Sequence, residues 1–168
     1  NHFFETLTGN NKEIPYLYPS ETPYTTKVLR KRVAEAPIVG GNLALISSLM
    51  GTKWQLDTRG KILLLEDVNE PPYKVDRMLT QLRLSGMFDH IEGLILASFY
   101  RCESDKPSSL SLEQVFDDVF DRYEFPILCG FPSGHIKEML TIPLGSFVRM
   151  DAEKVTPLKR MSHQLLEA

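Results

Sequence analysis

Residues 61–68 read KILLLEDV: four consecutive apolar residues, Ile62 to Leu65, are followed by two carboxylates, Glu66 and Asp67. A run that is apolar at every position is typical of a strand buried on both faces, as in parallel sheets covered by helices. Side chains that follow such a strand lie at its carboxyl end, where open α/β sheets place their functional residues. This stretch therefore predicts a central strand and one edge of a site.

Three segments have the capping residues and the spacing of amphipathic helices. The first is expected to begin after Asn42, whose side chain can accept hydrogen bonds from free amides of the first turn, and to end near Gly51. The second begins at Pro72, which suits a first helical turn. The third begins at Ser111, which forms a capping box with Gln114. Their expected apolar positions are Leu43, Leu45, Ile46 and Leu49, then Val75, Met78, Leu79 and Leu82, and finally Val115, Phe116, Val119, Phe120 and Tyr123.

Further strands are expected along the chain on either side of these helices. They fall at residues 25–34, 94–99, 126–129 and 147–150. Strands that alternate with helices favour an α/β domain with substantial parallel pairing. The first 25 residues, with prolines among tyrosines after a short helical stretch at residues 3–7, are interpreted as an extended connector.

The bulk composition limits the classes of function. The chain has 168 residues, 42% of them hydrophobic, and a net charge of −3, which fits one domain with a real core. Charges of both signs are dispersed, so neither nucleic acid nor an anionic membrane is an expected partner. Cys102 and Cys129 are far apart in sequence, which mildly favours a reducing compartment. The sequence starts at Asn1 with no initiating methionine, and its first residues have neither the basic region nor the cleavage site of a signal peptide, so we expect it to begin inside a longer chain.

Two residue types could carry acid–base chemistry. His135 follows the Gly/Pro turn GFPSG at residues 130–134, and an imidazole placed there can act as a general base near neutral pH. Glu66 could hold such an imidazole, as the acid of a serine-type triad does. The alternatives are that His135 only hydrogen-bonds its own turn and that Glu66 caps the next helix or pairs with Arg77. Asp67 and Glu70 compete with Glu66 for the same role.

Other chemistries have little support in the sequence. The chain has no Cys-x-x-Cys or His-x-x-x-His spacing for a metal, no Gly-x-Ser-x-Gly elbow and no glycine-rich nucleotide loop, so no cofactor is expected. Ser133 is two residues from His135 on an extended turn, so we expect its hydroxyl to have trouble reaching the imidazole. The pattern is interpreted as part of a hydrolytic site whose nucleophile lies outside this chain.

The motifs, taken in order, resemble the C-terminal half of the LD-carboxypeptidases, a serine peptidase family that includes the microcin-immunity peptidases. The resemblance runs from about residue 37 to residue 151, and its specificity comes from the joint order of the motifs. The matching segments are VGGNL (39–43), GT (51–52), GKILLLEDV (60–68), PYKVDRMLTQL (72–82), GFPSGH (130–135) and LTIPLG (140–145).

The resemblance implies a fold and a division of the site between two domains. The family's C-terminal domain has a swivelling β/β/α architecture, an α/β fold with a mixed sheet and flanking helices, and its N-terminal domain carries the nucleophilic serine in a Gly-x-Ser-Asp turn. Glu66 matches the family acid and His135 the family base, whereas the serine has no counterpart in this chain. Residues 1–36 would then be the tail of the first domain and the linker, and residues 37–168 the C-terminal catalytic half-domain.

The implied activity is hydrolysis of the amide bond before a terminal D-amino acid, which turns murein tetrapeptide into tripeptide and D-alanine in cytoplasmic peptidoglycan recycling. The implied partners are the murein peptide and the missing N-terminal domain, with a homodimer as a further expectation. This chain alone is expected to be inactive. The alternatives are a microcin-immunity peptidase with the same chemistry on a peptidyl-nucleotide, and a domain that binds or assembles without catalysing.

Two stretches depart from the family pattern. The segment IKEM at residues 136–139 is more hydrophobic and acidic than the small, glycine-containing run of the family, and could change how the histidine loop rests on substrate. The polar insert at residues 101–110 has no role that the sequence reveals.

Overall fold

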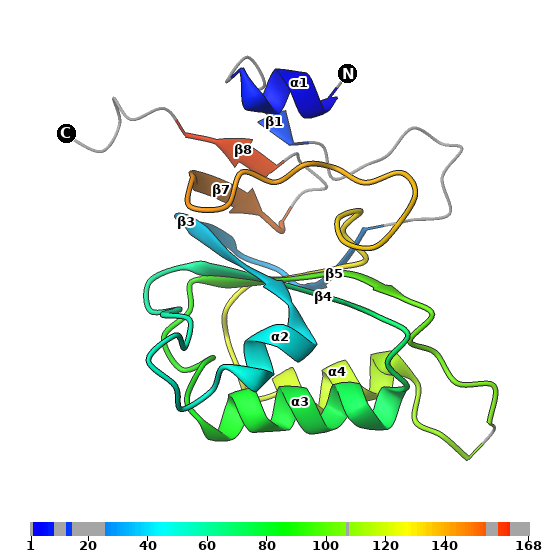
Figure 1. Ribbon diagram of the computed structural model, residues 1–168. Coiled ribbons are helices and arrows are strands. Elements are labelled where there is room, and N and C mark those ends of the chain that lie inside the picture. The colour runs from blue at the N-terminus through cyan, green and yellow to red at the C-terminus, as the bar shows by residue number, and fades with distance from the viewer. Residues whose placement is uncertain (1, 9–12, 15–25, 107, 154–157, 162–168) are drawn as a thin grey trace.

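The described residues of the computed structural model are 2–8, 13–14, 26–106, 108–153 and 158–161 (Figure 1). They form an eight-stranded mixed sheet in the order β1-β8-β7-β3-β4-β5-β6-β2. The strands are β1 (Glu13–Ile14), β2 (Lys27–Arg30), β3 (Val33–Asn42), β4 (Ile62–Val68), β5 (Gly93–Tyr100), β6 (Ile127–Cys129), β7 (Phe147–Asp151) and β8 (Leu158–Arg160). The helices are α1 (His2–Leu7), α2 (Leu43–Ser48), α3 (Pro72–Leu84) and α4 (Leu112–Phe120).

Strand β3 joins an antiparallel part of the sheet to a parallel part. Its first half, from Val33 to Pro37, pairs antiparallel with β7, and its second half, from Ile38 to Asn42, pairs parallel with β4. Strands β4, β5 and β6 continue in parallel, and β2 closes that edge antiparallel to β6. The mixed sheet with flanking helices agrees with the α/β fold expected from the sequence.

Both faces of the parallel strands are covered, and this explains the unbroken apolar run of β4. Helices α2, α3 and α4 pack on one face (Figure 1). The other face packs against β7, β8 and the segment that follows β6, which contributes Phe131 and Leu140. Every residue of β4 except Val68 is buried. A strand in this position needs apolar side chains in both directions, as the sequence predicted.

The local signals for the helices are largely confirmed. Asn42 caps α2 by accepting a hydrogen bond from Leu45 N, Pro72 begins α3, and Ser111 forms its capping box at the start of α4. The prediction that Leu45 and Leu49 lie on the apolar face is wrong, because the two residues are 67% and 39% exposed. Helix α2 has only six residues, and Leu43 and Ile46 already occupy its buried face.

The single strand expected at residues 25–34 is also wrong. The structure has β2 at the outer edge of the sheet, next to β6, and then β3 at its centre, so the chain leaves the sheet at Lys31 and Arg32 before it re-enters. Strand β3 continues through Gly40 and Gly41 to Asn42. Glycines usually weaken a strand, but here Gly40 allows the close approach of two backbones: a Cβ on it would lie 1.9 Å from Leu64 O.

The N-terminal segment contributes a short strand that the sequence did not reveal. Strand β1 pairs antiparallel with β8, which was equally unforeseen, and α1 covers the helical stretch expected at residues 3–7. The prolines and tyrosines of the expected connector lie outside the described residues. None of the helices in the described part of the chain is long and apolar enough to cross a membrane.

Candidate active site

Glu66 is the buried carboxylate at the carboxyl end of β4. Its residue is 6% exposed, and its Cα pairs in register with that of Asn42 on β3. Its Oε2 lies 2.7 Å from Nδ1 of His135, which belongs to the loop after β6. The structure therefore brings together the two residues that the sequence nominated as acid and base, and it does not pair Glu66 with Arg77.

The loop that carries His135, residues 130–140, is anchored to β5 by backbone hydrogen bonds. Gly130 N donates to Leu96 O at 2.8 Å, and Ser98 N donates to Ser133 O at 3.0 Å. Phe131 is completely buried beneath the loop. These contacts fix the path of the chain on both sides of the turn, so the imidazole is presented by a rigid support rather than by a free loop.

An irregularity in β5 makes one of these anchors available. The register with β4 runs from Leu65↔Leu96 to Asp67↔Phe99, so β5 has one more residue than β4 over this interval. A bulge of this kind leaves a backbone group without a ladder partner. Ser98 lies within the bulge and donates its amide to the histidine loop. The irregularity next to Glu66 thus ties the loop to the sheet at the level of the carboxylate.

Gly134 allows the loop to lie directly over Glu66. A Cβ on Gly134 would come within 2.7 Å of Glu66 Oε2 and 3.0 Å of Glu66 Cβ. Its φ of +119° is also a conformation that residues with a side chain rarely adopt. Both the space and the backbone therefore require glycine immediately before His135.

The electrostatics of the pair favour a charged imidazole. The Glu66 carboxylate raises the pKa of His135 above its usual value of 6.5, first by the hydrogen bond to Nδ1 and then by its negative charge. The side chain of His135 is 58% exposed. A neutral imidazole that donates its Nδ1–H to Glu66 carries its lone pair on Nε2, the nitrogen that is then free to accept a proton.

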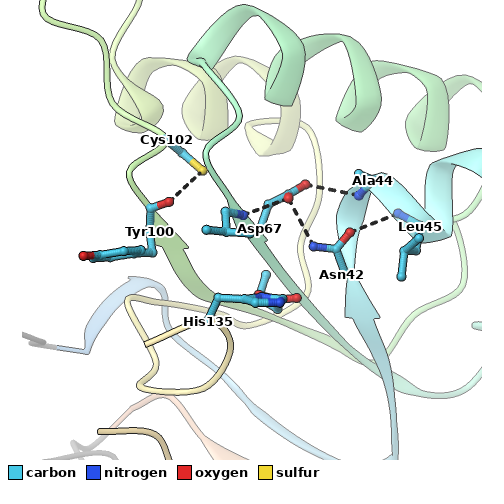
Figure 2. A network of polar contacts seen from close by, with 9 residues as sticks. Asn42, Ala44, Leu45, Asp67, Tyr100, Cys102 and His135 are labelled. Atoms are coloured by element: carbon cyan, nitrogen blue, oxygen red, sulfur yellow. Dashed lines mark hydrogen bonds and ion pairs between the residues drawn. The ribbon is translucent and has the colours of Figure 1, made fainter. Parts of the chain in front are cut away.

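Asp67 does not hydrogen-bond to His135, because it points to the other face of the sheet (Figure 2). Its carboxylate accepts hydrogen bonds from Asn42 Nδ2 at 3.1 Å, Ala44 N at 3.1 Å and Val68 N at 2.8 Å. Burial raises the pKa of Asp67 above its usual range, and these hydrogen bonds partly oppose that effect. Asp67 holds the start of α2 and the amide of Asn42, a link that the sequence did not reveal.

The remaining candidates are also placed away from the imidazole. Glu70 lies 2.9 Å from Lys74 Nζ, an ion pair across one turn at the start of α3. Cys102 and Cys129 are both free thiols. Within the described ranges, no group of three or more His, Cys, Asp or Glu side chains is arranged to hold a metal ion.

A protein-family model described as the LD-carboxypeptidase C-terminal domain matches residues 35–150 of the chain. The chain belongs to this family. The matched segment contains β4, the histidine loop and the Glu66–His135 pair, which are the motifs that carried the resemblance in the sequence.

Individual relatives agree with this assignment. A probable murein peptide carboxypeptidase of Bacillus subtilis is 38% identical over 146 residues, which cover 86% of this chain and 46% of the relative. The microcin C7 self-immunity protein MccF of Escherichia coli is 30% identical over 120 residues, covering 70% of this chain and 34% of the relative. The chain thus spans less than half the length of these two curated relatives.

Solved structures show the same fold. A structure of MccF in complex with glutamyl sulfamoyl guanosine superposes with a TM-score of 0.82 at 23% identity, covering 96% of this chain and 54% of that one. At this level of identity the match establishes the α/β architecture alone. The chain is thus a member of the LD-carboxypeptidase C-terminal domain family with the α/β architecture of these structures.

Proposed function

We propose that this chain is the acid–base half of a serine-type LD-carboxypeptidase, whose nucleophilic serine lies on an N-terminal domain outside this chain. The observation that carries the proposal is the 2.7 Å contact between His135 Nδ1 and Glu66 Oε2. It falls within the range of about 2.6–3.2 Å that an acid–base pair requires. The exposed side of the imidazole is where a serine from another domain would approach.

In this proposal His135 Nε2 removes the proton of the serine as the serine attacks the carbonyl carbon before a terminal D-amino acid. The imidazolium then gives that proton to the leaving amine of D-alanine, and a water molecule repeats the sequence on the acyl-enzyme. Glu66 keeps the imidazole in the required tautomer and stabilises the imidazolium, consistent with the raised pKa of His135. The oxyanion would be stabilised by donors of the N-terminal domain.

Murein tetrapeptide is the proposed substrate, in cytoplasmic peptidoglycan recycling. Its support is the family and the name of the Bacillus relative, a probable murein peptide carboxypeptidase. The chain alone supplies a base and its orienting carboxylate without a nucleophile, so it is proposed to be inactive. Residues 1–36 are proposed to connect it to the N-terminal domain, and residues 37–168 to form the catalytic half-domain, although β2 and the first part of β3 already belong to the sheet.

The test compares this chain alone with the longer protein that carries both halves, and measures the D-alanine released from murein tetrapeptide. We expect no release above background from this chain and turnover from the longer protein. His135→Gln and Glu66→Gln should each abolish most of that turnover. For Glu66→Gln we expect kcat to fall by up to about four orders of magnitude. His90→Gln is the matched control, because His90 is an exposed histidine away from the loop.

Other outcomes would assign other functions. Release of D-alanine by this chain alone, lost in His135→Gln, would show that the chain contains its own nucleophile. Hydrolysis of a peptidyl-nucleotide in place of tetrapeptide would favour the microcin-immunity activity. A longer protein that binds either peptide without cleaving it would favour a binding module and would refute the catalytic roles of Glu66 and His135.

A further inference from the structure

Tyr100 is the last residue of β5, the strand next to the one that carries Glu66, and Arg101 follows it. Phe99 packs its ring against Phe116 of α4, with centroids 5.1 Å apart, so it faces the helices. The next residue of a strand faces the opposite way. Tyr100 therefore lies on the same face as His135, and Figure 2 shows both rings on the side of the sheet away from the helices.

The distance from Tyr100 to Glu66 follows from the register of β4 and β5. Tyr100 pairs with Val68, two residues beyond Glu66 on the neighbouring strand. A strand rises by about 3.3 Å per residue and neighbouring strands lie about 4.8 Å apart, so the two Cα atoms are separated by about 8 Å. A peptide bound with its scissile amide at His135 spans that distance in about two residues.

The backbone at Arg101, directly after β5, is held in an unusual conformation. Arg101 has a φ of +55°, a region that glycine and asparagine tolerate and that is unfavourable for other residues. The turn is fixed on both sides: Cys102 N donates to Phe99 O at 3.3 Å, and Asn69 N donates to Tyr100 O at 2.9 Å. Cys102 is itself completely buried. An arginine thus occupies a rigid position that favours glycine.

The guanidinium of Arg101 is positioned but has no acidic partner. It lies over the ring of Tyr100, 5.1 Å from the centroid, and within the described residues it forms no hydrogen bond or ion pair with a carboxylate. Nearby Lys74 is paired with Glu70, and His135 with Glu66. Arg101 therefore keeps its planar set of donors available at the end of β5, on an aromatic surface that restricts its motion.

We infer that Tyr100 and Arg101 form a subsite that binds a free carboxylate of the peptide substrate, on the acyl side of the bond to be cleaved and about two residues from it. The guanidinium matches a carboxylate in a bidentate geometry, and it offsets the repulsion that Glu66 and Asp67 would exert on an anionic peptide. This inference rests on the proposed function, because it takes the Glu66–His135 pair as the place where the bond is cleaved.

The test uses the longer protein with both halves and murein tetrapeptide, the proposed substrate. Two analogues have the free carboxylate of the second or the third residue converted to an amide. We expect Arg101→Gln to lower kcat/KM for the tetrapeptide about tenfold to hundredfold, mainly through KM, as for the loss of a charge-assisted hydrogen bond. Against one of the two amides, the variant and the unmodified protein should have the same kcat/KM.

Two control variants distinguish a loss of substrate binding from a loss of stability and from a general effect of removing a positive charge. Arg59→Gln removes an exposed guanidinium just before β4, at the opposite end of that strand from Glu66, and should leave kcat/KM within about twofold of the unmodified protein. Arg101→Gly removes the guanidinium while it relieves the unfavourable φ, so it should raise KM as Arg101→Gln does without lowering Tm.

The outcomes are distinct for each claim. The subsite would be overturned if Arg101→Gln left kcat/KM unchanged, or lowered it equally for the tetrapeptide and both amides. It would also be overturned if Arg59→Gln lowered kcat/KM as much, or if the loss of kcat/KM followed a fall in Tm. Absence of D-alanine release by the unmodified longer protein would instead overturn the proposed function on which the inference rests.

Discussion

Glu66 and Asp67 are consecutive residues of β4, and their carboxylates lie on opposite faces of the sheet. Glu66 Oε2 contacts His135 Nδ1 on one face, whereas Asp67 accepts hydrogen bonds from Asn42 and Ala44 on the face covered by the helices. Strand alternation alone separates them. The two neighbours therefore have different tasks, one at the imidazole and one in the fold, and substituting each should change a different observable.

Glu66→Gln should lower the pKa of His135 toward 6.5. The carboxylate raises that pKa through its hydrogen bond and its charge, and an amide retains an acceptor but loses the charge. The measurement is an NMR titration of the His135 imidazole in this chain. Glu70→Gln is the control, because Glu70 pairs with Lys74; a pKa that moves equally in both variants would contradict the direct role of Glu66.

The same pair should make stability depend on pH. A histidine whose pKa is higher in the folded than in the unfolded chain contributes stability that is fully present below about pH 6.5. That contribution is lost as the pH rises through the raised pKa of folded His135. The difference in unfolding free energy between the unmodified chain and Glu66→Gln should therefore be larger at pH 5.5 than at pH 8.5, as measured by urea denaturation. A difference that is the same at both pH values would contradict the prediction.

Asp67→Asn should destabilise the fold with little effect on the imidazole. Three donors point at the Asp67 carboxylate, and the NH2 group of an asparagine would face at least one of them. The unfolding free energy should therefore fall by about 1–3 kcal/mol. Asp118→Asn on the exposed face of α4 should cost less than about 0.5 kcal/mol. Urea denaturation measures both, and a neutral Asp67→Asn would show that these hydrogen bonds contribute little to folding.

Signals that act within a few residues explain what could be predicted of the fold. Each of these signals lies within a few neighbouring residues and is visible in the sequence. They are the apolar run of β4, the cap at Asn42, the first turn at Pro72 and the capping box at Ser111. Strand β3 was missed because its extent is set by partners far along the chain, β7 for one half and β4 for the other. Leu45 was misplaced because the length of α2 decides which of its leucines are covered.

The same division applies to the candidate site. Glu66 and His135 could be nominated from a strand end and a Gly/Pro turn, but Asp67 and Glu70 remained rivals in the sequence. The pairing of the strands decides which face Glu66 and Asp67 occupy, and the contact with Lys74 at the start of α3 sets Glu70 apart. The bulge in β5 and the left-handed conformation of Arg101 arise from contacts across the sheet, and neither leaves a signal in the neighbouring residues.

Gly40→Ala should have a much larger effect than Gly41→Ala. Both glycines have positive φ values, so an added side chain strains the backbone at each, by about 1 kcal/mol or more. At Gly40 the new Cβ would also lie 1.9 Å from Leu64 O, whereas at Gly41 it would meet nothing within 4 Å. We expect Gly40→Ala to lose more than about 3 kcal/mol or to fail to fold. Equal unfolding free energies for the two variants would refute the close approach of β3 and β4.

Gly134→Ala should weaken the Glu66–His135 contact itself. The new Cβ would lie 2.7 Å from Glu66 Oε2, so either the carboxylate or the histidine loop has to move. We expect the pKa of His135 to fall toward 6.5, as in Glu66→Gln, and the unfolding free energy to fall by about 1–3 kcal/mol because of strain.

Gly145→Ala is the matched control, because Gly145 also has a positive φ but open space around its Cβ position. Gly145→Ala should cost stability without changing the His135 titration. A Gly134→Ala chain with an unchanged His135 pKa would show that the contact does not depend on the bare backbone over the carboxylate.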